Sequence, residues 1–190
     1  MSTNNTPKTA LLAAAISVLA LSANTVWAQP ATTTKPATMA KADASKLVRA
    51  DSSMLGDLAQ GNRAEVEAGQ MALEKSQNAD VKKFAQMMVD DHTKALGEVE
   101  SLAQSKNVKL PDGVGAVHKT KAVALKALSG NTFDSQYAKR AGVGDHESTV
   151  KLLKKIQADG KDADLKALAD KMLPTVEHHL EMAKQLAAAK

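Results

Sequence analysis

From residue 51 to its end, the chain places apolar side chains three and four residues apart, as an amphipathic α-helix does. No stretch alternates apolar and polar residues like a β-strand, and the helix-favouring residues Ala, Leu, Lys, Gln and Glu dominate. Four long helices are predicted over residues 53–76, 78–106, 133–158 and 162–190, with a shorter one over 114–128. Because short turns separate the long helices, we expect an all-α, antiparallel four-helix bundle with one short accessory helix.

Polar residues mark where these helices begin. The predicted N-caps are one of Asp51, Ser52 or Ser53 for the first helix, Asn78 for the second and Asp162 for the last. Gly142 and Gly144 fall inside the third long helix, and glycine weakens a helix interior. We therefore expect that helix to be irregular near these two glycines.

The N-terminal segment has the layout of a secretory signal peptide. A lysine precedes the apolar run ALLAAAISVLALSA, and the small residue Ala28 ends the segment. Cleavage is expected between Ala28 and Gln29, which predicts a periplasmic or secreted protein. We thus expect three parts: a signal peptide over 1–28, a flexible linker rich in Thr, Ala, Lys and Pro over 29–50, and the helical-bundle domain over 51–190.

The composition excludes several classes of protein. The sequence has no cysteine, which excludes disulfides, thiolate metal sites and a lipid-modified cysteine. After the signal peptide, no apolar stretch approaches the roughly 20 residues of a transmembrane helix. The formal net charge is +4, but lysines and acidic residues are interspersed and the aromatic residues are few (Trp 1, Tyr 1, Phe 2), so nucleic-acid binding is not expected.

Three histidines lie on the apolar faces of separate predicted helices. His92, His146 and His179 each share the stripe of their helix with Val, Leu, Ala or Met residues, within roughly 60° at about 100° per residue. On the first long helix, Glu65 flanks the apolar stripe and Asn62 lies inside it. All of these polar side chains are therefore expected to point toward the interior.

The same side chains lie at similar depths along their helices. Glu65, His92 and His146 lie near the middle, and His179 lies about 5 Å past the middle of the last helix at 1.5 Å per residue. In an up-and-down bundle the helix midpoints share one level. The sequence therefore predicts a central polar cluster to which four separate helices each contribute one group.

Two interpretations of this cluster stay open. Three imidazoles and a carboxylate suit one transition-metal ion, such as zinc, iron, manganese or copper. The candidate metal ligands are then Glu65, His92, His146 and His179, and the candidate outer partners that orient the rings are Asp91 and Asp145. In the alternative, the histidines bond to acidic and amide side chains in a metal-free polar core.

Residue spacing bears on two narrower kinds of metal site. A ferritin-type di-iron site needs two Glu-x-x-His repeats, but the residues three positions before the histidines are Val89, Val143 and Val176. Ferroxidase chemistry is therefore not expected.

A copper site is a second, narrower alternative. Met88 and Met182 lie one turn from His92 and His178, and thioethers suit cuprous copper, although methionine is also an ordinary core residue.

Three motifs follow one another along the chain: VDDH, FDSQY with a later GDH, and LPTVEHH. With them, residues 51–187 resemble the bacterial secreted family called domain of unknown function 4142, which is placed among ferritin-like helical bundles. The resemblance carries over the family's characteristic positions onto Glu65, Asp91, His92, Phe133, Asp134, Tyr137, His146, Pro174 and His179. It implies an exported, ferritin-like bundle and no defined activity.

No nucleophile elbow, HExxH zinc motif, phosphate-binding loop or dinucleotide fingerprint is present in the sequence. We therefore favour a non-enzymatic periplasmic protein with a binding or envelope-stress accessory role, while an enzymatic role stays open. The rival prediction is a metal-binding protein whose site, three histidines and one glutamate, lies in the bundle core. A third is recognition of an envelope-protein partner through an apolar groove; the sequence does not define the oligomeric state.

Overall fold

The computed structural model describes residues 46–189, which are helical and contain no β-strand. Its elements are α1 (Arg49–Lys75), α2 (Ala79–Ser105), α3 (Gly115–Lys126), α4 (Gly130–Tyr137), the π-helix η1 (Ala138–Asp145), α5 (His146–Asp159) and α6 (Ala163–Ala188). The expected signal peptide and most of the expected linker lie outside the described residues. No helix within 46–189 combines the length and the apolar character that a membrane crossing requires.

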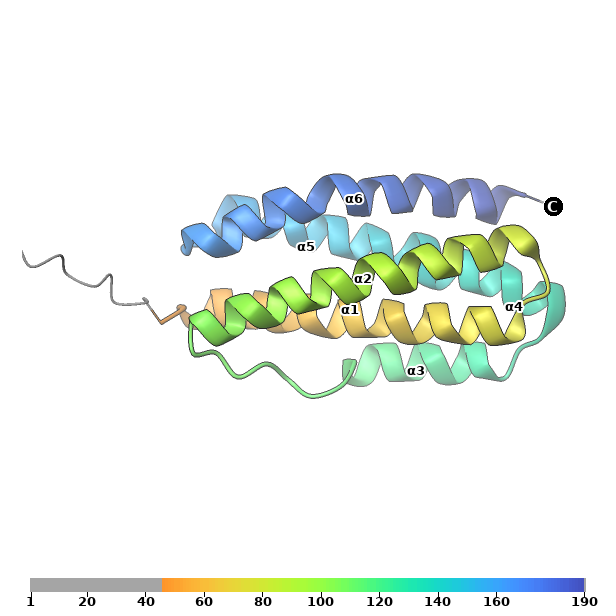
Figure 1. The fold of residues 1–190 in the computed structure, drawn as a ribbon, viewed down its shortest axis with the longest axis horizontal. Helices are drawn as coiled ribbons and strands as arrows, with labels where there is room; N and C mark the ends of the chain where they lie inside the picture. Colours follow the sequence, from red (N-terminus) through yellow and green to blue (C-terminus); the bar gives the residue numbers. More distant parts are fainter. Residues whose placement is uncertain (1–45, 190) are drawn as a thin grey trace, which may run out of the picture. The chain divides into compact units, whose positions relative to one another are not determined.

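The helices form an all-α bundle (Figure 1). α1 packs mainly against α2, and α6 packs against α5, η1 and α2. α4, η1 and α5 follow one another without a non-helical residue between them. The short helix α3 lies alongside α1, after the extended segment that follows α2 (Figure 1). The predicted all-helical class is confirmed.

Two of the predicted N-caps are confirmed and one is wrong. The side chain of Asn78 accepts bonds from the backbone N–H groups two and three residues ahead, at 2.8 and 3.2 Å. Asp162 does the same at the start of α6, at 3.0 and 3.0 Å. α1, however, begins earlier than predicted, at Arg49, and its N-cap Val48 provides no side-chain bond.

Asp51, one of the expected caps, instead links two distant parts of the chain. Its side chain is buried, and its Oδ2 accepts bonds from the backbone N–H groups of Lys161 and Asp162, at 2.9 and 2.7 Å. These two residues form the turn between α5 and α6. One carboxylate therefore fixes this turn against the start of α1.

The expected irregularity near the glycines takes the form of η1. Gly142 lies in this π-helix and faces α6, where an added Cβ would come within 2.9 Å of the Cβ of Ala183. The missing side chain lets η1 and α6 approach closely. A π-helix in the middle of a longer helical segment is often associated with a functional site, and His146 follows η1 directly.

The interior consists of two apolar clusters with polar side chains between them. The first cluster includes Leu55, Leu58, Val99, Leu153, Ile156 and Leu165. The second includes Phe84, Met88, Phe133, Tyr137, Ala141 and Ala183. Along each long helix the polar side chain falls where one cluster gives way to the other. We call the buried residues Asn62, Glu65, His92, His146 and His179 the polar layer.

We predict that Asp51→Ala lowers the free energy of unfolding by about 2–4 kcal/mol, because two backbone N–H groups lose a charged acceptor. Asp51→Asn keeps one acceptor oxygen and should cost less. Urea unfolding measures both, with the exposed Asp112→Ala as the control. A loss for Asp51→Ala no larger than that of the control would contradict this role.

Candidate metal centre

Three imidazoles of the polar layer converge at one point. One ring nitrogen from each of His92, His146 and His179 lies within 4.8 Å of the others. The ring centroids are 5.4, 5.4 and 5.5 Å apart. The three side chains come from α2, α5 and α6, and all are buried. The structure thus brings together three of the four candidate ligands named from the sequence.

The neighbours of His92 determine which of its nitrogens carries the proton. The Asn62 side-chain Nδ2 donates to the carbonyl oxygen of Leu58 at 2.7 Å, so its Oδ1 is the atom that faces His92. That oxygen lies 2.9 Å from Nδ1 of His92 and can only accept. Nδ1 therefore donates, and in the neutral ring Nε2 is left with a free lone pair.

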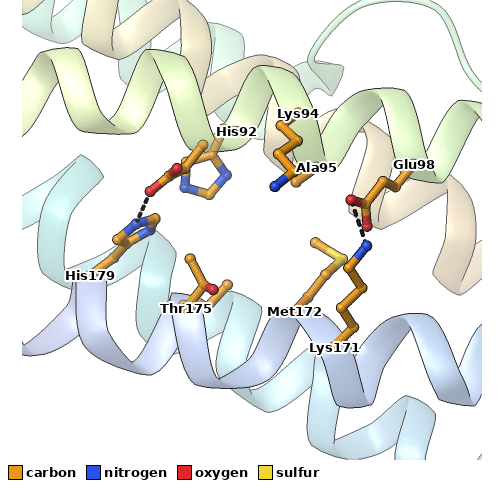
Figure 2. Close-up of a pocket in the computed structure, with 10 residues that line it drawn as sticks. His92, Lys94, Ala95, Glu98, Lys171, Met172, Thr175 and His179 are labelled. Atoms are coloured by element: carbon orange, nitrogen blue, oxygen red, sulfur yellow. Dashed lines mark hydrogen bonds and ion pairs between the residues drawn. The ribbon is translucent and has the colours of Figure 1, made fainter. Parts of the chain in front are cut away.

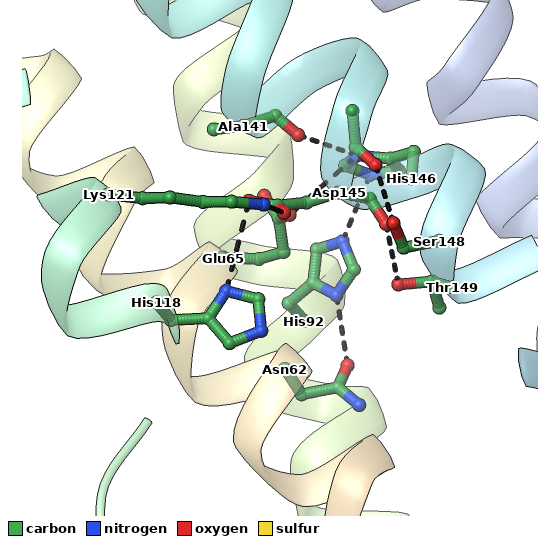
Figure 3. A network of polar contacts seen from close by, with 11 residues as sticks. Asn62, Glu65, His92, His118, Lys121, Ala141, Asp145, His146, Ser148 and Thr149 are labelled. Atoms are coloured by element: carbon green, nitrogen blue, oxygen red, sulfur yellow. Dashed lines mark hydrogen bonds and ion pairs between the residues drawn. The ribbon is translucent and has the colours of Figure 1, made fainter. Parts of the chain in front are cut away.

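His146 has the same arrangement through the main chain. Its Nδ1 donates to the carbonyl oxygen of Ala141 in η1, at 3.1 Å, so its Nε2 also carries a free lone pair. The Nε2 atoms of His92 and His146 lie 3.4 Å apart (Figure 3). With both rings in these tautomers, no proton lies between the two nitrogens, and two lone pairs face each other.

His179 presents its other nitrogen. Its Nε2 donates to Oδ2 of Asp91 at 2.9 Å. Its Nδ1 is buried and has no hydrogen-bond partner among the described residues. The layer therefore contains three unprotonated, unpaired nitrogens: Nε2 of His92, Nε2 of His146 and Nδ1 of His179.

Burial keeps these rings neutral. Desolvation lowers the pKa of His146 to about 4, against a partial increase from its bond to Ala141. Desolvation, followed by repulsion from His146 and His179, lowers the pKa of His92 well below its usual 6.5. The pKa of His179 is also lowered by burial, although Asp91 opposes the shift. At neutral pH all three imidazoles are in the form that binds metals.

Glu65, the fourth candidate ligand, lies beside this group. Its Oε1 is 3.8 Å from Nδ1 of His146, and Glu65 does not belong to the group whose ligand atoms all lie within 4.8 Å of one another. Its Oε2 is buried and has no hydrogen-bond partner among the described residues. Desolvation raises the pKa of this carboxyl well above 4.5, with a further increase from Asp145 and an opposing effect of Lys121.

The two candidate outer partners lie in different surroundings. Asp91 contacts the cluster directly, through its bond from His179. Asp145 forms an ion pair with Lys121 on α3, and its Oδ2 is 3.9 Å from Nδ1 of His118 (Figure 3). Among the described residues, Asp145 makes no hydrogen bond to a histidine of the polar layer. Asn62, which the sequence placed inside the apolar stripe but not among the candidate outer partners, takes the position that orients His92.

The two methionines considered as cuprous-copper ligands, Met88 and Met182, lie in or against the second apolar cluster. Met88 is fully buried there, and Met182 is partly buried and packs against the same cluster. Both positions are those of ordinary core residues.

The geometry fits a metal ion. Imidazole nitrogens bind zinc at about 2.0–2.1 Å, so two such nitrogens at a tetrahedral angle lie about 3.4 Å apart. The Nε2 atoms of His92 and His146 are separated by 3.4 Å. One nitrogen of His179 lies within 4.8 Å of a nitrogen of each of the other two rings, and its buried Nδ1 has no hydrogen-bond partner among the described residues. Each ring also donates its N–H to a fixed acceptor, the arrangement that is usual for histidines that bind metals.

A small cavity of about 110 Å³ lies between α2 and α6 and reaches this site (Figure 2). His92 and His179 form part of its wall, together with Asp91 and Thr175, whereas His146 does not line it. Phe84 packs against the ring of His146, with the ring centroids 6.5 Å apart. The cluster is therefore reached from the groove between α2 and α6.

Comparison with solved structures places the fold among known helical bundles. A DUF305 fragment from Deinococcus radiodurans aligns with a TM-score of 0.66 and 12% identity, covering 74% of this chain and 97% of that one. CopM in its Cu(II)-bound form aligns with a TM-score of 0.60 and 19% identity, covering 72% and 95%. Its Cu(I)-bound form gives a TM-score of 0.59 and 17% identity, covering 71% and 93%.

No curated protein matches the chain. A family model, in contrast, matches residues 35–186, which include all of the polar layer. This match identifies the chain as a member of the family described as "Domain of unknown function (DUF4142)".

Proposed function

We propose that this protein is an exported, non-enzymatic metal-binding accessory protein that holds one transition-metal ion between His92, His146 and His179. The observation that carries the proposal is a group of three buried histidines, each with one unprotonated nitrogen, that bring one ring nitrogen apiece within 4.8 Å of one another. The metal-free polar core explains it less well. That alternative leaves Nδ1 of His179 without a partner and two acceptor nitrogens face to face.

Copper is the first ion to test. CopM, whose fold is similar, has been solved with Cu(I) and with Cu(II) bound. At under 20% identity this likeness concerns the fold, so it selects an experiment and does not assign a ligand set. Three neutral imidazoles suit either copper or zinc.

We further propose that the protein is exported and that its helices form a four-helix bundle. The expected signal peptide over 1–28 supports a periplasmic or secreted protein. Counting α4, η1 and α5 as one helix gives a ferritin-like antiparallel four-helix bundle with α3 as the accessory helix. In such bundles, metal sites are built from side chains that project inward from facing helices.

In this proposal, each residue of the layer has a separate task. The three histidines bind the ion, which supplies positive charge and a Lewis acid. Asn62, Ala141 and Asp91 accept the remaining N–H groups and so keep the ligand nitrogens unprotonated. The carboxyl of Glu65 lies next to Nδ1 of His146 and is not part of the three-histidine group.

We predict that protein purified from periplasm without a histidine tag binds one equivalent of Cu(II) or Zn(II). His92→Ala, His146→Ala and His179→Ala should each lower the affinity by about 100-fold or more, and Asn62→Leu by about 10- to 100-fold. Elemental analysis gives the stoichiometry, and competition with a chelator gives the affinity.

Two histidines outside the cluster provide matched controls. His178 is exposed and neighbours His179, and His118 lies on α3. Alanine at either position should leave metal binding unchanged. Equal losses in His178→Ala and His179→Ala, or a wild-type protein that binds neither metal, would contradict the proposal.

A second prediction concerns pH. The folded pKa values of the three histidines lie below the unfolded value of about 6.5, so the unfolded state binds more protons as the pH falls. The free energy of unfolding should therefore be unaffected by these groups above about pH 6.5 and should fall as the pH drops toward 4. For His146 alone the loss is on the order of 3 kcal/mol.

Glu65 acts in the opposite direction, because a raised carboxyl pKa favours the folded state at low pH and is unfavourable as the pH rises. The measurement is therefore made in Glu65→Gln, without metal, by urea unfolding between pH 7 and pH 4.5. Stability should fall with pH, and less steeply when His146→Gln is added. Identical slopes in the two variants would contradict the assignment of a neutral, buried His146.

A further inference from the structure

The three histidines leave one side of their meeting point open. His146 is 1% exposed and is backed by Phe84, so that side is closed. His92 and His179, in contrast, line the cavity between α2 and α6. In a tetrahedral arrangement, an ion held by three nitrogens has one coordination position left open. The cavity is where a ligand from solvent reaches that position.

The charge around the site favours an anion there. Three neutral imidazoles carry no charge to balance a divalent ion, and the carboxyl of Glu65, next to Nδ1 of His146, is not part of the three-histidine group. Of the pocket's other charges, Lys171 and Glu98 lie 2.7 Å apart and cancel, whereas the Asp91 carboxylate, bonded to the neutral ring of His179, balances one of the two charges of a divalent ion and leaves one. Burying an uncompensated charge is costly, so a small anion beside the ion stabilises it.

Lys94 contributes a positive charge to the cavity wall. It lines the same cavity, beside His92 and Ala95 (Figure 2), and it has no ion-pair partner among residues 46–189. A cationic side chain near an open metal position attracts anions from solvent and is sensitive to salt.

We infer that the cavity between α2 and α6 is the binding site of a small monodentate anion, which occupies the open coordination position of the ion held by His92, His146 and His179. This inference rests on the proposed metal site. The cavity volume of about 110 Å³ suits an anion of a few atoms. The bound ion therefore exchanges its fourth ligand with solvent through this groove.

The test uses protein loaded with Cu(II) and titrated with sodium azide at constant ionic strength, followed by the charge-transfer absorption and the electron paramagnetic resonance spectrum. A saturable, one-to-one response is expected. Thr175 is exposed and lines the cavity, so Thr175→Phe should fill it and weaken azide binding by about tenfold or more, with the copper stoichiometry unchanged. Thr175→Val, of similar volume, is its control.

Lys94→Gln should weaken azide binding by about two- to fivefold, as expected for one solvent-exposed charge. Lys83→Gln, an exposed lysine on the same helix outside the cavity, should have no effect. If Thr175→Phe does not fold, Ala95→Met fills the same cavity from α2.

The outcomes separate the two proposals. Copper-loaded protein that shows no saturable azide response overturns the anion site and leaves the metal site standing. Equal azide binding in the filled variant and in Thr175→Val also overturns the anion site. A wild-type protein that binds no copper or zinc overturns both.

Discussion

Burial of three imidazole rings is the constraint on which the rest of the structure depends. A buried N–H must find an acceptor, and in this bundle each of the three rings finds one from a different source: the Asn62 amide, the Ala141 carbonyl and the Asp91 carboxylate. Each neutral ring has a single proton to donate. Once it is engaged, the other nitrogen keeps a free lone pair, and the bundle gathers the three rings so that one nitrogen of each lies within 4.8 Å of the others.

The surrounding fold supports this arrangement at some cost to stability. Two apolar clusters lie on either side of the polar layer, and they provide the burial that stabilises the bundle. The layer itself contains unpaired acceptors and a carboxyl with a raised pKa, which apolar side chains of the same size would avoid. Natural proteins retain such features at functional sites. A bound ion would return stability, because a ligand that binds only the folded state favours it.

The sequence predicts those features that arise from local chemistry. The caps at Asn78 and Asp162 need only residues two and three positions ahead, and the inward direction of the histidines follows from the 3.6-residue period. Asp51 has the residue type and position of a cap, yet its partners are 110 residues away in the chain. The acceptor for His146 is a main-chain oxygen of η1, which no side-chain pattern encodes. Likewise, the edge of the ring that Glu65 faces depends on packing between helices.

The central claim concerns which nitrogens carry protons, and nitrogen-15 NMR of the histidine side chains in the metal-free protein tests it most directly. The account predicts Nδ1–H tautomers for His92 and His146 and the Nε2–H tautomer for His179 near neutral pH, with the three unprotonated nitrogens changing resonance when Zn(II) is added. A proton on Nε2 of His92 or His146 would contradict it. That proton would join the two rings by an ordinary hydrogen bond, and the layer would be a polar core without a metal.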